Sequence, residues 1–144
     1  MAVRALRGHI VCLSGKNWPQ QASQAQKAFS KHENQTRVHV TRLERICREL
    51  GGSPRGKKCV GVEGILQQGK DLMKEKPAPD AGLISATQHV EHYEMAGYGT
   101  CRTWARTLGY ANQAQLLQAT LDEEQQTDLD LTALAESSVY IDAE

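Results

Sequence analysis

Residues 88–100, which read QHVEHYEMAGYGT, combine helix-forming residues with two inward-facing glutamates, and this combination decides the fold. At helical spacing, one stripe through this region contains Ile84, Thr87, Glu91, Glu94 and Tyr98. Glu91 and Glu94 lie one turn apart in the middle of that stripe, whereas His89 and Tyr93 point elsewhere. The sequence therefore predicts a helix that turns two carboxylates toward the interior of a helical bundle.

Two other predicted helices carry polar side chains on their apolar stripes in the same way. The stripe of the last helix reads Leu117, Leu121, Glu124, Asp128, Leu131 and Ala135. The stripe of the first long helix reads Phe29, His32, Gln35 or Thr36, His39, Leu43, Ile46 and Leu50. Carboxylates and imidazoles thus occupy positions at which a plain bundle would have Leu or Ala.

Glycine and proline residues separate the predicted helices. The periodic segments between these breaks predict helices over residues 22–50, 59–75, 80–108 and 111–137. Asp80 is expected to cap the third helix, and Gly109 is expected to end it. Because the connections are short, neighbouring helices should run antiparallel.

The domain organisation that we expect is an atypical N-terminal segment over residues 1–21, a bundle over residues 22–137 and a tail over residues 138–144. Residues 1–32 contain no acidic side chain, which is also a feature of targeting peptides. The break at Trp18 and Pro19 favours an irregular start instead.

The composition is that of one all-α domain. The 144 residues suffice for a single modest core, only 5% of them are aromatic, and Ala, Leu, Gln and Glu are abundant.

With 17 basic and 17 acidic residues, the chain has no overall charge that would attract nucleic acid. No apolar run approaches the roughly 20 residues of a membrane span. The four cysteines form no CxxC pair and are typical of reduced thiols. We therefore expect a cytoplasmic protein without a nucleic-acid, membrane or defined small-molecule partner.

Buried carboxylates require compensation, because an ionised carboxylate without a partner costs several kcal/mol in an apolar interior. Bound cations, buried Arg or His⁺ partners, or protonation of the acids can provide it. Carboxylates on facing helices suit a pair of hard metal ions, as in ferritin-like bundles. The candidate ligands are Glu91, Glu94, Glu124 and Asp128, with His39 assisting. A single inward acid is more often a rim residue paired with Arg or Lys, and His32 is interpreted as a core or rim histidine.

Four segments of the chain resemble the YciE/YciF-type ferritin-like stress proteins of bacteria, over about residues 23–135. The segments are AFSKHENQTRVHVTRLERI, KKCVGVEGILQQGKDLM, DAGLISATQHVEHYEMAGYGT and LLQATLDEEQQTDLDLTALA. The resemblance implies a rubrerythrin-like antiparallel four-helix bundle with a short extra helix in the crossover. It also implies a dimer and a carboxylate-rich site for two metal ions, with iron or manganese as the expected cofactor. The biochemical activity of that family is not defined.

The chain departs from that family in three places. It has Gln35 before Thr36, and it has Gln67 and Gln68, where the family has glutamates. Residues 1–21 do not match the first bundle helix of the family, which is therefore missing, shortened or replaced; an altered reading frame would give the same mismatch. Fewer negative ligands predict a lower metal affinity.

Two functions are compatible with these observations. The first is a metal-binding stress protein that uses the ligands named above. The alternative is a non-catalytic bundle with a degenerate site, which acts through oligomerisation or protein interaction. It predicts that Glu91 and Glu124 pair with His32, His39 or Arg42. No HExxH motif, nucleophile elbow, phosphate-binding loop or dinucleotide fingerprint is present, so no catalytic residue is assigned and no demonstrable activity is expected.

Overall fold

The computed structural model describes residues 24–75 and 80–139, and every regular element in these two ranges is helical. The helices are α2 (Gln24–Glu49), α3 (Val60–Leu72), α4 (Asp80–Thr107) and α5 (Ala111–Leu134), followed by a π-helical turn, η1 (Ala135–Val139). The expected all-α fold is therefore confirmed, and the predicted helices lie within three residues of the observed ones. The expectations for residues 1–21 lie outside the described residues.

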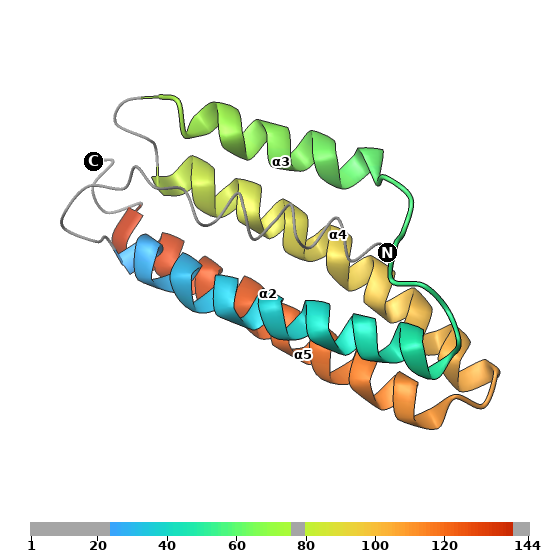
Figure 1. Cartoon of the computed structure of the whole chain (residues 1–144). Helices are drawn as coiled ribbons and strands as arrows, with labels where there is room; N and C mark the ends of the chain where they lie inside the picture. Colours follow the sequence, from blue (N-terminus) through green and yellow to red (C-terminus); the bar gives the residue numbers. More distant parts are fainter. Residues whose placement is uncertain (1–23, 76–79, 140–144) are drawn as a thin grey trace.

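The bundle is built on the antiparallel pair of α4 and α5, which share the most extensive helix contact. Helix α2 packs on α5, and α3 packs on α4. Figure 1 shows α2 beside α5 and α3 beside α4, with the long axes of the helices close to parallel or antiparallel. The side chains that α2, α4 and α5 turn inward therefore meet along the bundle interior. In the two described ranges, none of the helices has the length and apolar character that crossing a bilayer would require.

Glycines end two of the long helices. Gly51 after α2 and Gly109 after α4 have φ values of 68° and 81°, a left-handed conformation that favours glycine. The amide of Tyr110 donates to the carbonyl of Ala105 at 2.8 Å, and that of Gly109 donates to Arg106 at 3.1 Å. This Schellman pattern uses carbonyls that the last helical turn leaves free. The prediction that Gly109 ends its helix is confirmed. Helix α4 is described from Asp80 onward, and the cap expected there stays a prediction, because residues 76–79 lie outside the described residues.

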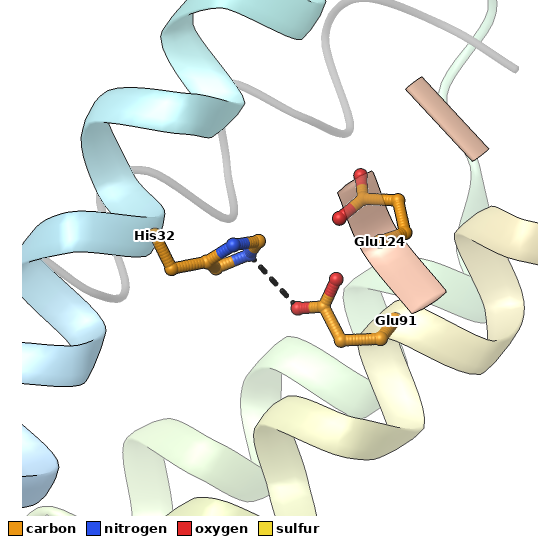
Figure 2. A group of neighbouring side chains, drawn as sticks. All are labelled: His32, Glu91 and Glu124. Carbon is orange, nitrogen blue, oxygen red and sulfur yellow. Dashed lines mark ion pairs between the residues drawn. The ribbon is translucent and has the colours of Figure 1, made fainter. Parts of the chain in front are cut away.

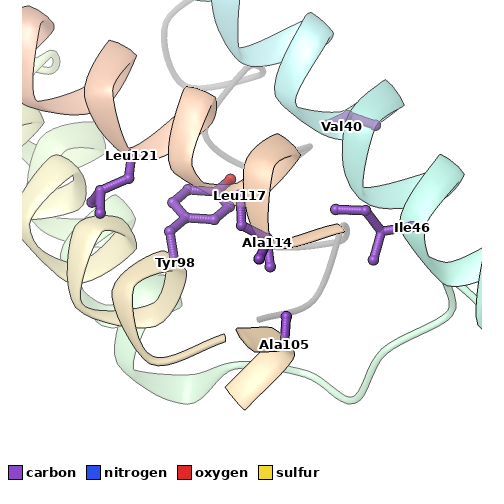
Figure 3. Packing of buried hydrophobic residues seen from close by; sticks show 7 residues of the cluster. All are labelled: Val40, Ile46, Tyr98, Ala105, Ala114, Leu117 and Leu121. Carbon is purple, nitrogen blue, oxygen red and sulfur yellow. The ribbon is translucent and has the colours of Figure 1, made fainter. Parts of the chain in front are cut away.

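Two apolar clusters lie at opposite ends of the bundle and leave a polar layer between them. Figure 3 shows the cluster near the α4–α5 turn, where the aromatic ring of Tyr98 lies beside Leu117. The cluster at the other end contains Phe29, Leu83, Ile84, Leu131 and Ala135. A third, smaller cluster joins α3 to α4 through Val62, Leu66 and Val90. Buried between the two ends are His32, Thr36, His39, Glu91, Glu94 and Glu124. Water is thus excluded from a layer that is rich in ionisable groups.

Replacing Gly109 by Ala should lower the free energy of unfolding by about 1 kcal/mol, because alanine is strained at a positive φ. Gly99→Ala is the matched control, since Gly99 lies inside α4 and a Cβ there would meet nothing within 4 Å. This control should raise the free energy of unfolding by roughly 0.5–1 kcal/mol. Urea denaturation of both variants measures the two shifts. Shifts of the same sign would contradict the assigned helix end.

Candidate metal centre

Three helices bring ionisable side chains to one point in the polar layer. His32 comes from α2, Glu91 from α4 and Glu124 from α5, with relative exposures of 3%, 0% and 0%. One ligand atom from each residue lies within 4.8 Å of the other two. Figure 2 shows the His32 ring and the Glu91 carboxylate turned toward each other, with Glu124 beside them. Two ligands of one metal ion are up to about 4.4 Å apart. The group is therefore close to the size of a coordination shell.

The third buried acid, Glu94, is 1% exposed and lies one turn after Glu91 on α4. Helical spacing turns both acids to the same side, as the sequence predicted. Interaction with Glu124 helps to raise the pKa of both Glu94 and Glu91. The cluster thus contains three carboxyl groups from two facing helices, which is the arrangement that divalent ions use in helical bundles.

Two histidines of α2 contact these carboxyl groups. The Nε2 atom of His32 is 2.9 Å from Oε1 of Glu91, and Nδ1 of His39 is 2.9 Å from Oε1 of Glu124. His32 and His39 are seven residues apart and therefore lie on one face of α2. Each buried ionisable pair thus joins α2 to a different helix.

Burial separates the protonation states of the acids. Burial, and then the charge of Glu124, raises the pKa of Glu91 well above its usual value. The same two causes raise the pKa of Glu94. Burial alone would raise the pKa of Glu124 too, but hydrogen bonds with His39 and Glu91 outweigh it and lower the pKa to about 2. The ionised form is therefore favoured at Glu124, whereas the protonated form is favoured at Glu91 and Glu94, and a metal ion would compete with these protons.

His32 is suited to present a lone pair to a metal. Burial lowers the pKa of His32, which favours the neutral ring. The hydroxyl of Thr127 donates to the backbone carbonyl of Glu123 at 3.1 Å, and its oxygen lies 3.4 Å from Nδ1 of His32. A proton on Nδ1 can therefore be donated to Thr127, which leaves the lone pair of Nε2 directed at Glu91. A second residue that holds the ring in this way is typical of metal-binding histidines.

The structure places the remaining predicted ligands differently. The Asp128 side chain is 18% exposed; it accepts a hydrogen bond from Gln88 Nε2 at 3.1 Å, and its other oxygen lies 3.4 Å from Nε2 of His92. Asp128 therefore lies beside the cluster. His39 is fully buried, and both its nitrogens contact carboxylates. Metal ligation by either residue stays a prediction.

His32 is the member that the sequence did not single out. Its place on the inward stripe of α2 was recognised, and its burial agrees with a core histidine. What the stripe did not indicate is that this histidine, among those of α2, meets Glu91. The sequence feature that could have identified His32 is its seven-residue spacing from His39, which places both rings on the same face of α2.

Of the three glutamines at positions where the resemblance implies glutamates, Gln35 lies beside this cluster, next to Thr127. Gln35 is half-buried, and its Oε1 lies 3.3 Å from the hydroxyl oxygen of Thr127. Gln67 is exposed and donates to Asp71 at 3.0 Å, and Gln68 is also exposed. The central group of one histidine and three acids is therefore intact without them.

Three comparisons with known proteins agree with one another. Residues 18–144 match the family described as "Domain of unknown function (DUF892)". Protein YciF of Escherichia coli strain K12 is 38% identical over 122 residues, which cover 82% of the chain and 74% of that protein. The crystal structure of the E. coli stress protein YciF has a TM-score of 0.76 and 34% identity, and the match covers 96% of this chain and 85% of that chain. YcfI from Rhodopseudomonas palustris has a TM-score of 0.71 and 26% identity, over 90% and 80% of the two chains.

Glu91→Gln should stabilise the metal-free protein at pH 8. Because the folded pKa of Glu91 is raised, its contribution to stability is fully present below its unfolded pKa, about 4.3, and is lost as pH rises through the folded pKa. Glutamine avoids this loss, which amounts to about 1.4 kcal/mol per unit of pKa shift. The gain over the parent should shrink as pH falls toward 4.5. Urea denaturation in the presence of a chelator, at pH values from 4.5 to 8, measures it.

The control for this series is Glu63→Gln, which changes a carboxyl group that is 41% exposed and paired with Lys58. This variant should differ from the parent by no more than about 0.5 kcal/mol across the series. A Glu91→Gln variant that is less stable than the parent at pH 8 would contradict the raised pKa of Glu91.

Proposed function

The chain belongs to the DUF892 family, and from this premise we propose that it is a ferritin-like stress protein that binds a divalent transition-metal ion between α2, α4 and α5. The observation that carries the proposal is the buried group of His32, Glu91 and Glu124, whose ligand atoms lie within 4.8 Å of one another. The E. coli relative is described as a stress protein, which supports the physiological part.

The donor set favours certain metals. One imidazole nitrogen with two or three carboxylates suits iron, manganese, cobalt or zinc, whereas calcium prefers more oxygen ligands and a more open site. Iron or manganese agrees with the resemblance to ferritin-like proteins. When bound, either ion would supply redox or Lewis-acid chemistry.

The surroundings of the cluster would raise its affinity for a metal ion. The ligands lie in a layer from which water is excluded, because apolar clusters cover both ends. Tyr98, which is 1% exposed, closes the layer on the side of the α4–α5 turn. Burial, followed by the charges of nearby Glu94 and Glu124, raises the pKa of the Tyr98 hydroxyl. Tyr98 therefore stays a neutral phenol beside the carboxylates.

Two observations favour the alternative of a non-catalytic bundle with a degenerate site. Glu91 and Glu124 do have histidine partners, which is what that alternative predicts. In addition, Trp104 and Leu108 near the end of α4 are 64% and 67% exposed, as a protein-interaction surface or a dimer contact would require. Both functions share one structure, so the metal affinity distinguishes them.

Glu124→Gln should weaken Co²⁺ binding at least about tenfold, because the substitution removes the ionised carboxylate from the group. The measurement is the shift in urea or thermal unfolding of the chelator-treated protein as Co²⁺ is added. A ligand that binds only the folded state adds about 2.7 kcal/mol at 100 times its dissociation constant. Mn²⁺ and Fe²⁺ under anaerobic conditions provide parallel series.

The control for this experiment is again Glu63→Gln, which should respond to Co²⁺ as the parent does. Metal content far below one ion per chain, unchanged by Glu124→Gln, would reject the metal-binding function and leave the alternative.

A further inference from the structure

We propose that the buried hydroxyl of Tyr98 donates a hydrogen bond to a small exogenous molecule that shares the coordination shell of the ion. The chemical class is a small molecule with lone pairs, such as water or a small anion, which can bind a cation and also accept a hydrogen bond. The inference rests on the proposed function and deepens it, because it makes the centre an open site that takes a ligand and not a closed structural site.

The Tyr98 hydroxyl is a buried hydrogen-bond donor. Tyr98 is 1% exposed, and among residues 24–75 and 80–139 no polar atom forms a hydrogen bond with its hydroxyl oxygen. The large majority of buried polar side-chain atoms in proteins have a partner, because a polar atom that leaves water without one is unfavourable. A phenol is neutral at physiological pH and carries a proton to donate. The described part of the fold therefore leaves this donor to a ligand.

Tyr98 lies beside the acids of the candidate metal centre. It follows Glu94 by four residues and Glu91 by seven, so helical spacing places all three on one face of α4. Its ring packs edge-on against His39, with 6.4 Å between the ring centroids, and Nδ1 of that histidine is 2.9 Å from Oε1 of Glu124. Figure 3 shows the ring of Tyr98 extending from α4 toward α5, the helix that carries Glu124.

A small molecule between the hydroxyl and the acids would satisfy both. Burial, and then the charges of Glu94, Glu124 and Glu91, raise the pKa of the hydroxyl, which agrees with acids close by. None of these carboxyl groups accepts a direct hydrogen bond from Tyr98. Polar groups that face each other beyond hydrogen-bond distance are commonly bridged by a small molecule such as water. Because apolar clusters close the layer at both ends, the bridging molecule must be small.

The donor set of the centre leaves a position for such a molecule. His32, Glu91 and Glu124 each offer one ligand atom within 4.8 Å of the others. First-row divalent ions take about four to six ligands, and sites with three protein ligands keep a position open for water or substrate. A further ligand from Glu94 would still leave an octahedral ion incomplete. A donor beside an open position favours exogenous ligands that accept a hydrogen bond.

Packing alone does not require a hydroxyl at this position. Phe29, which is 3% exposed, contributes an aromatic ring to the apolar cluster at the opposite end of the polar layer. The ring of Tyr98 packs in the cluster with Leu117 and Leu121, where phenylalanine would bury the same ring without an unpaired polar atom. A polar atom that packing does not explain is typical of a functional position.

The first experiment measures azide binding to the chelator-treated full chain after it is loaded with Co²⁺, followed through the visible absorption band of Co²⁺. Azide is the probe because it is a small anion that binds cations and accepts hydrogen bonds. It should shift the band of the parent. Tyr98→Phe should bind Co²⁺ as the parent does, but should bind azide at least about tenfold more weakly, because a hydrogen bond to a charged acceptor is lost.

The outcomes of this experiment separate the two proposals. Equal azide affinities for the parent and Tyr98→Phe, or no effect of azide on the parent, would overturn this inference and leave the proposed function standing. Loss of Co²⁺ binding in Tyr98→Phe would also overturn it, since Tyr98 would then be a ligand of the ion itself. A parent that binds no Co²⁺ would overturn the proposed function, and this inference with it.

The second experiment needs no metal. Urea denaturation of the chelator-treated proteins should give Tyr98→Phe a midpoint equal to or higher than that of the parent, because the substitution removes an unpaired buried oxygen. A lower midpoint would show that the hydroxyl already has a partner in the metal-free fold, which would overturn the inference.

The matched control for both experiments is Tyr110→Phe. Tyr110 is 43% exposed and lies in the turn before α5, so its hydroxyl is not enclosed with the acids. This variant should keep the urea midpoint, the Co²⁺ affinity and the azide affinity of the parent. An equal loss of azide affinity in Tyr110→Phe and Tyr98→Phe would overturn the role assigned to Tyr98.

Discussion

Withdrawal of three carboxyl groups from water is the constraint on which the rest of this structure depends. Glu91, Glu94 and Glu124 lie in the middle of the bundle, where ionised acids are unfavourable by several kcal/mol unless they are paired or neutralised. Two features offset this cost: burial raises the pKa of Glu91 and Glu94, which favours their neutral forms, and Glu124 faces a histidine of α2. A bound metal ion would take the place of these protons, so the charge of the buried acids is offset with or without an ion.

This polar layer reduces stability, and the two apolar clusters compensate for it. Leucines at the three acidic positions would bury apolar surface without any cost of desolvation. The chain instead packs Phe29 and Leu131 on one side of the layer and Tyr98 and Leu117 on the other, which keeps the helices in register. Retention of ionisable groups at an energetic cost is typical of functional sites.

The supporting residues give the centre a definite asymmetry. His32 can present a lone pair to the cluster, since Thr127 lies next to its other nitrogen. The two nitrogens of His39 lie 2.9 and 2.7 Å from carboxylate oxygens of Glu124 and Glu123, and Arg42 holds Glu123 on the far side of the ring. Two histidines on one face of one helix therefore have different neighbours: Glu91 and Thr127 for His32, and Glu123 and Glu124 for His39.

The sequence by itself determined the helices, their ends and the inward facing of Glu91, Glu94 and Glu124, because these follow from local spacing and from glycines with positive φ. It also indicated the stripe that contains His32 and His39. It left open which histidine meets which acid, and it did not indicate that Asp128 contacts Gln88 and His92 beside the cluster. Only the tertiary structure decided these pairings, because they depend on how far α2 is shifted and rotated against α4 and α5. Packing between helices sets that shift, and no periodicity within one helix encodes it.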